Sequence, residues 1–317
     1  MDNSTDVISM ECDTNSSTSI EIFLYIMQAS YIIPGIILHF MILRTVLWKM
    51  KMVSANNSFY VIYTMDSIAS VTILLCDISF TRLFIYVSPL CPLVSPFFFT
   101  PSIIAKISYV LPNYMKAMKS VTQIFMVINR MSCVLFPFVY TQKWKTYLPI
   151  IVMFTLLSPS LVTWNLVISR QYPMAIFGGF SIIYTKKVSW AKLSTFHLIF
   201  LTISMVITII CTSTTLYNLI TLPNRIKSSE RTLCLATIII SIGFSAIGIT
   251  QFLYAFCASC QLSAILLTLQ FICYDFLNIG SPLVIIIMNA DIRKLLFNKR
   301  EVSTNVVPAR TSMMYNS

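Results

Sequence analysis

The sequence predicts an all-α membrane protein: a seven-transmembrane helix bundle with its N-terminus outside the cell. A short amphipathic inner-leaflet helix is expected after the seventh span. Composition, the length of the apolar runs and the placement of Lys and Arg carry this prediction. Of 317 residues, 57% are hydrophobic and 10% charged, against roughly 25% charged in a soluble domain. A soluble fold of this length could not bury so much apolar side chain, so a membrane class is favoured.

Seven apolar runs are each long enough to cross a bilayer core, which takes about 20 residues of helix. Backbone polar groups must be satisfied within lipid, so these runs are expected to be helices. They lack the strict alternation of barrel strands. The third run is interrupted by Lys116 and Lys119. The runs are Ile20–Leu47, Phe59–Val87, Ile107–Met131, Tyr147–Ile168, Leu193–Ile220, Leu233–Phe256 and Leu262–Met288.

These runs divide the chain into three parts. Residues 1–19 form an extracellular N-terminal segment, residues 20–289 the transmembrane bundle, and residues 290–317 an amphipathic helix and cytoplasmic tail. The first segment is polar and lacks the basic start of a cleavable signal, so the first span is expected to direct its own insertion.

The distribution of basic residues predicts the orientation. With the N-terminus outside, 13 Lys and Arg fall in inner segments and five in outer ones, as the positive-inside rule requires. The net charge of +11 is therefore accounted for by basic residues that lie against membrane lipid on the inner side. No nucleic-acid partner is implied. Two glycosylation sequons begin at Asn3 and Asn15, which agrees with an outer N-terminus, although chance matches in a Ser- and Asn-rich stretch are the alternative.

The segment ADIRKLLFNKR follows the seventh span at residues 290–300. Ile292, Leu295 and Leu296 share one helical face, and basic residues surround it. This pattern is typical of a short helix lying along the inner leaflet.

Four strings, in this order, carry a family resemblance. They are FYVIYTMDSIASV at 59–71, NRMSCVLFPFVY at 129–140, GGFSIIYTKKVSWA at 178–191 and MNADIRKLLF at 288–297. Together they resemble the nematode serpentine receptor class gamma family of chemoreceptors over nearly the whole chain. The resemblance implies a plasma-membrane G-protein-coupled receptor that binds a small-molecule ligand outside and activates a heterotrimeric G protein inside. It implies no cofactor and no enzymatic activity.

Arg130 is the first candidate for a signalling residue. It occupies the place of the arginine in the acidic-Arg-aromatic triplet of rhodopsin-like receptors, but the triplet here is Asn129-Arg130-Met131. Because Asn129 carries no charge, Glu230 at the inner start of the sixth span is the candidate partner. The Arg130–Glu230 pair would then hold the third and sixth helices together at rest. Otherwise Arg130 is a topology anchor and Glu230 a solvated loop residue.

Charged residues at membrane depth are costly and usually face a partner inside the bundle. Asp66 and Asp77 lie in the second run, Lys116 and Lys119 in the third, and Asp275 in the seventh. Counting from the inner ends at 1.5 Å per residue places Asp275 level with the lysines. We therefore expect Asp275 to pair with Lys116 or Lys119, either beside a ligand pocket or as a structural staple.

Two further polar groupings are expected. Asp66, Asn278 and Ser281 lie at comparable depth and resemble a polar cluster of rhodopsin-like receptors that holds water or a sodium ion. The seventh span, however, reads Asn-Ile-Gly-Ser-Pro at 278–282, which departs from the Asn-Pro-x-x-Tyr of those receptors. Asp77 shares a helix face with Asp66 and is expected to pair with Arg82 near the outer rim.

Four of the nine cysteines fall outside the membrane, where disulfides persist. Cys91 is expected to pair with Cys12, Cys257 or Cys260, or to stay free, and the sequence does not choose among them. Cys257-x-x-Cys260 lacks a second pair of ligands, so no metal site is expected.

The remaining alternative is a membrane transporter or ligand-gated channel. Transporters usually show internal repeats and Gly- or Pro-broken helices, whereas this chain has six glycines, no visible repeat and an odd number of spans. No catalytic motif of the common hydrolases or nucleotide-binding enzymes is present.

Overall fold

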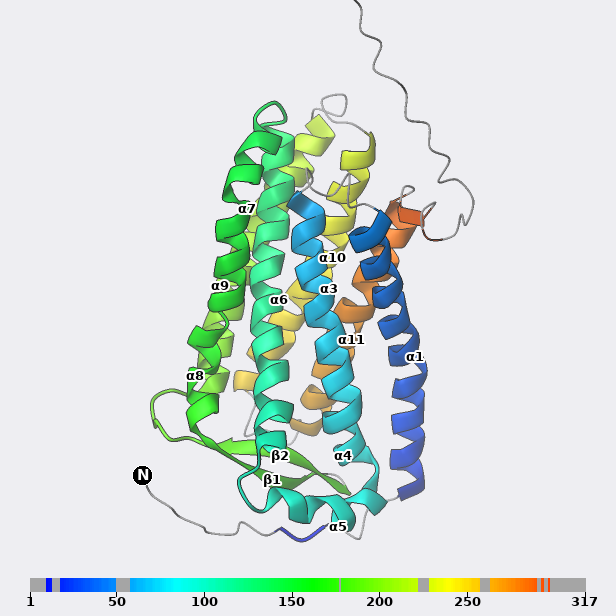
Figure 1. Ribbon diagram of the computed structural model, residues 1–317, viewed down its shortest axis with the longest axis vertical. Helices are drawn as coiled ribbons and strands as arrows, with labels where there is room; N and C mark the ends of the chain where they lie inside the picture. The colour runs from blue at the N-terminus through cyan, green and yellow to red at the C-terminus, as the bar shows by residue number, and fades with distance from the viewer. Residues whose placement is uncertain are drawn as a thin grey trace, which may run out of the picture.

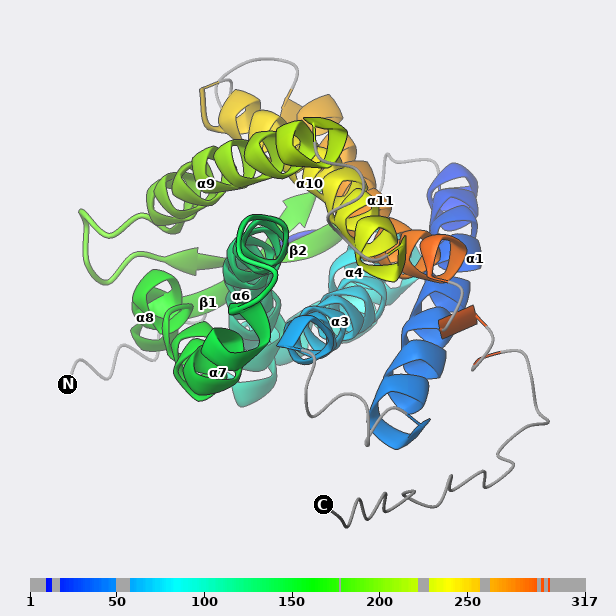
Figure 2. The same cartoon turned by 90° about the horizontal axis from the view of Figure 1, so that it is seen from above.

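The computed structural model describes residues 10–12, 18–49, 58–176, 178–221, 228–256, 263–289, 292–293 and 296. Its long helices run side by side along one axis (Figure 1), and the end view shows them grouped around α6 and α3 (Figure 2). Within the described residues, six helices are long and apolar enough to cross a membrane, or seven if a bent pair is one span. The predicted all-α membrane bundle is confirmed.

Each apolar run becomes one long helix or two to three consecutive helical segments. The first comprises α1 and a π-helical turn, η1; the second α3, π-helix η2 and α4; the fourth α7 and α8. The bounds are α1 Thr18–Arg44, η1 Thr45–Lys49, α3 Ser58–Cys76, η2 Asp77–Arg82, α4 Leu83–Tyr86, α6 Ile103–Leu135, α7 Tyr140–Leu157, α8 Ser160–Ile168, α9 Leu193–Thr221, α10 Ser228–Phe256 and α11 Ser263–Met288.

The interrupted third run lies inside the bundle. Helix α6 has 33 residues and a length of about 50 Å at 1.5 Å per residue. It packs most extensively against α3 and α9 and also touches α10. Its lysines therefore have protein neighbours, which is how a charged helix is accommodated at membrane depth.

The outer end is closed by short elements that the apolar pattern does not reveal. An antiparallel hairpin, β1 Arg170–Ile176 and β2 Gly179–Thr185, pairs Arg170 with Thr185 and Ile176 with Gly179. It crosses the end of the bundle in Figure 1 beside α5 Cys91–Val94. Two short 3-10 helices, η3 Ser88–Leu90 and η4 Ser95–Phe98, flank α5.

Close backbone contact holds this hairpin down. A Cβ at Gly179 would lie 2.0 Å from the carbonyl oxygen of Phe84, so only glycine fits there. The rings of Phe84 and Phe180 stack at 4.8 Å between centroids, and Phe98 packs against both. A disulfide joins Cys12 to Cys91 in the same cluster, so the chain before α1 is also attached to the outer end.

At the inner end, Asn289 terminates the seventh span. Its Oδ1 accepts a hydrogen bond from the backbone N–H of Ile292 at 3.1 Å, which is how an N-cap residue starts a helix. Ile292 is buried and packs in the main core, and Leu296 contacts it. Most of the predicted amphipathic helix at 290–300 lies outside the described residues, so it stays a prediction.

Candidate functional site

A cavity of about 470 Å³ lies in the outer half of the bundle, under the hairpin. This volume is within the roughly 300–1,000 Å³ of small-molecule sites. The second, third, fifth, sixth and seventh spans and the hairpin all contribute to its wall. Its lining includes Asp77, Phe80, Thr81, Ile85, Tyr109, Asn113, Lys116, Met174, Ile176, Ile182, Tyr184, Lys186, Ser194, His197, Gln251, Gln270, Phe271 and Tyr274.

A buried ion pair lies beside this cavity. Arg82 Nη2 donates to Asp275 Oδ1 at 2.6 Å, and the side chains are 0% and 7% exposed. The Tyr31 hydroxyl donates to Asp275 Oδ2 at 2.7 Å, and Gln28 accepts from Arg82 at 3.2 Å. The ring of Phe271, which lines the cavity, lies 5.2 Å from the guanidinium. The pair therefore links α1, η2 and α11 next to the cavity wall.

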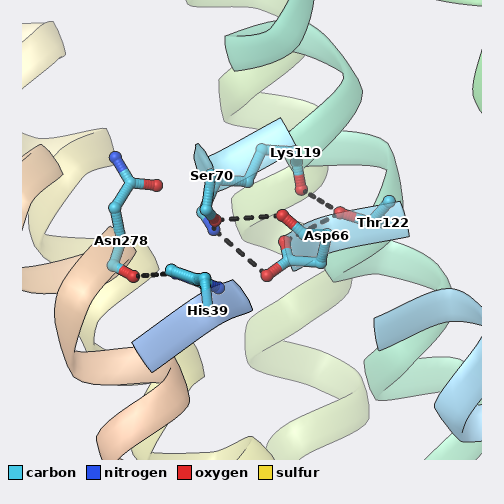
Figure 3. A network of polar contacts seen from close by, with 6 residues as sticks. All are labelled: His39, Asp66, Ser70, Lys119, Thr122 and Asn278. Atoms are coloured by element: carbon cyan, nitrogen blue, oxygen red, sulfur yellow. Dashed lines mark hydrogen bonds and ion pairs between the residues drawn. The ribbon is translucent and has the colours of Figure 1, made fainter. Parts of the chain in front are cut away.

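A second buried ion pair lies deeper, near the middle of the bundle. Lys119 Nζ donates to Asp66 Oδ2 at 3.1 Å and to Ser70 Oγ at 2.5 Å. Thr122 donates to Asp66 Oδ1 at 3.0 Å. Figure 3 shows these groups converging between α3 and α6. Both charges are satisfied by a partner and by hydroxyls, as burial of charge requires.

These pairs correct the predicted pairing of Asp275 with Lys116 or Lys119. Asp275 pairs with Arg82, and Lys119 pairs with Asp66. The expected Asp77–Arg82 pair is likewise wrong, because Arg82 directs its guanidinium to Asp275. Counting residues gives depth along a helix but not direction around it. The π-helix η2, from Asp77 to Arg82, also shifts the helical phase, which sequence counting did not include.

Lys116 lies one turn closer to the outer end than Lys119 and lines the cavity. Its Nζ lies 4.9 Å from the centroid of the Tyr274 ring, a cation–π distance. Among the described residues, no carboxylate lies within ion-pair distance of it.

The Asp66, Asn278 and Ser281 side chains are all buried, as expected, but Asp66 does not bond to the other two. The two carboxylate oxygens of Asp66 accept hydrogen bonds from Lys119 and Thr122. The Lys119 ammonium group therefore provides the positive charge that a sodium ion provides in the rhodopsin-like cluster. His39 Nε2 donates to the Asn278 carbonyl at 2.6 Å (Figure 3). The side-chain amide of Asn278 and the Ser281 hydroxyl have no hydrogen-bond partner among the described residues.

A third network surrounds Arg130 at the inner end. Arg130 is 1% exposed, and its Nη2 donates to Asn129 Oδ1 at 2.7 Å and to the Tyr140 hydroxyl at 3.1 Å. Asn129 Nδ2 donates to Ser58 Oγ at 2.7 Å. The guanidinium also lies 4.3 Å from the Phe59 ring centroid. Asn129 thus connects α6, α3 and α7, and its neutral amide accepts from Arg130 where an acidic residue would do so.

Several candidate residues fall outside what can be described. Glu230 belongs to the first turn of α10, but its side chain is not among those described. Asn3, Asn15, Cys257 and Cys260 also lie outside the described residues. Of the outer cysteines, Cys91 has Cys12 as its disulfide partner. No cluster of three metal-ligating side chains occurs in the described part of the chain.

Tyr31 and Tyr140 are the site residues that the sequence did not single out, and Arg82 was singled out with the wrong partner. Arg82 had a detectable signal, since it is an arginine within the second apolar run. The two tyrosines had none, because partly buried aromatic residues occur in every span.

The fold and its interior define the class: a multi-pass helical membrane protein of serpentine form, with a cavity at one end and a buried arginine network at the other. Comparison with known proteins places it further. The family model "Srg family chemoreceptor" matches residues 25–296, and the chain belongs to this family of chemoreceptors, which is not an enzyme family.

Relatives from Caenorhabditis elegans match along almost their whole length. The chain is 41% identical to serpentine receptor class gamma-15 over 95% of its own length and 94% of that protein. It is 41% identical to class gamma-5, over 91% and 90%, and 40% identical to class gamma-16, over 98% and 98%.

Proposed function

We propose that this protein is a G-protein-coupled chemoreceptor that binds a small molecule from outside the cell and activates a heterotrimeric G protein inside. The observation that carries the proposal is the placement of two sites in one bundle. The cavity lies at the predicted outer end, and the Arg130 network lies at the opposite end, where the positive-inside rule places the cytoplasm.

The structural connection between the two ends supports a switch. Helix α6 carries Lys116 in the cavity wall, Lys119 in the central ion pair and Arg130 in the inner network. A ligand that shifts α6 would therefore act on all three. Such a helix shift within a packed bundle is one of the recurring modes of allosteric change.

For the inner switch we retain the Arg130–Glu230 pair. The backbone of Glu230 lies at the start of α10, and α10 packs against α6. A resting-state stabilisation of about 1 kcal/mol by this pair would correspond to about fivefold in a two-state equilibrium.

The test uses the full-length receptor in cells with a second-messenger readout. Glu230→Gln is expected to raise basal G-protein signalling a few-fold at equal surface expression. Arg130→Ala is expected to abolish signalling in that background while the protein still reaches the surface. If Glu230→Gln leaves basal signalling unchanged, the Arg130–Glu230 pair does not hold the receptor at rest. Normal signalling by Arg130→Ala would reduce Arg130 to a topology anchor.

A further inference from the structure

We propose that the cavity recognises an organic acid, with the ligand's carboxylate on Lys116 and its apolar body against the aromatic and aliphatic wall. This inference rests on the proposed function, since it names the chemical class of the ligand for the same cavity. Its first support is the position of Lys116, a cation partly buried at membrane depth whose described contact is the face of Tyr274.

The electrostatic environment of Lys116 differs from that of the four intramembrane charges that form ion pairs. Arg82 has Asp275, and Lys119 has Asp66. A cation–π contact returns only about 0.5–2 kcal/mol, less than a paired carboxylate returns to a buried cation. Lys116 is therefore the cation of the cavity wall, among the described residues, that a ligand anion would stabilise most.

Asp77 also lines the cavity, so an amine ligand must be weighed. Asp77 is 2% exposed and accepts a hydrogen bond from the Thr81 hydroxyl at 3.4 Å. The Arg82 guanidinium is bonded to Asp275 and acts on Asp77 only at longer range. Lys186, exposed on the outer side of the same cavity, adds a second positive charge. The lining thus holds two ammonium groups against one carboxylate, which favours an anionic ligand over a cationic one.

A second observation in the same wall points to a ligand. His197 is only 6% exposed, and its Nε2 has no hydrogen-bond partner among the described residues. Buried polar atoms without a partner are rare in native proteins and call for a ligand, ion or water. His197 and Lys116 line one cavity from α9 and α6, so a polar head group between these helices would serve both.

The rest of the wall sets the form of the ligand. Phe80, Ile85, Met174, Ile182 and Phe271 give the cavity an apolar surface. A polar head on a short apolar chain or ring matches this distribution, because such sites combine an apolar lining with a few polar groups that orient the ligand.

The experiment uses the purified full-length receptor in phosphatidylcholine nanodiscs. Straight-chain carboxylic acids of about six to ten carbons, sized to the cavity, are compared with their methyl esters and the matching primary amines by thermal stabilisation. The acids are expected to stabilise the wild type most. Lys116→Gln should weaken the acids by about tenfold to a hundredfold, the range for a hydrogen bond to a charged group, and leave the esters unchanged.

Two further variants make the test specific. Lys116→Arg keeps the charge and should retain preference for the acids. Lys106→Gln removes an exposed lysine of the same helix that does not line the cavity, and should behave as wild type. The inference is overturned if the acids fail to stabilise the wild type, if esters or amines do so equally well, or if Lys116→Gln binds acids normally. Basal signalling by Glu230→Gln needs no ligand, so it can succeed when the acid inference fails.

Discussion

Breaking the Arg82–Asp275 pair from one side should destabilise the receptor far more than removing both charges. In Asp275→Asn, Arg82 stays 0% exposed and loses its carboxylate. Arginine is not deprotonated in proteins, so the buried positive charge remains. Leaving such a charge without its partner costs about 3–5 kcal/mol. The loss of the charged acceptor also weakens the hydrogen bond from Tyr31.

The double variant Arg82→Met with Asp275→Leu removes both charges and keeps similar volume. Replacing a buried pair by apolar residues is often neutral or stabilising, so most of the stability should return. A residual deficit of about 1 kcal/mol is expected because the Tyr31 hydroxyl loses its acceptor. The exposed Lys145→Met is the matched control for the loss of one basic residue.

Thermal unfolding of the purified receptor in nanodiscs provides the assay. Asp275→Asn should lower Tm by on the order of 10 °C, scaled from 3–5 kcal/mol, and the double variant should recover most of this. If Asp275→Asn unfolds within about 1 °C of wild type, or if the double variant is no better than the single one, the pair does not hold α1, η2 and α11 together.

Three other outcomes are expected. Cys12→Ser and Cys91→Ser should lower Tm equally and without additivity, because each removes the same 79-residue link, worth about 4.5 kcal/mol by loop closure; a free Cys91 thiol in non-reducing mass mapping would contradict this. Asn3→Gln with Asn15→Gln should abolish a glycosidase-induced gel shift, and a wild type without that shift would remove the glycosylation argument. Tyr140→Phe removes the hydroxyl that bonds Arg130 and Asn129, so it should alter basal signalling at equal surface expression; unchanged signalling would make that hydroxyl a structural group only.

The agreement between sequence and structure is best for the long helices. The fifth apolar run, Leu193–Ile220, and α9, Leu193–Thr221, differ by one residue. The first run and α1 start within two residues of each other. Lipid requires each segment to satisfy its own backbone and to be long enough to span the core, and both conditions are local.

The outer end shows the opposite case. The β1–β2 hairpin depends on Gly179 meeting the backbone of α4 and on Phe180 stacking with Phe84. These contacts join segments about a hundred residues apart in the sequence. The local residue patterns that predict a strand therefore cannot predict them.

The sequence by itself determined the membrane class, the positions of the spans and the family resemblance, because these follow from composition, run length and short strings. It also identified Asp66, Lys116, Lys119 and Asp275 as the charges that need an explanation. Only the tertiary structure decided the partner of each. Depth follows from residue count, but the angular position of a side chain depends on helix packing and on the π-helix at Asp77–Arg82. In the folded bundle Arg82 reaches Asp275, and Lys116, on α6, faces the cavity.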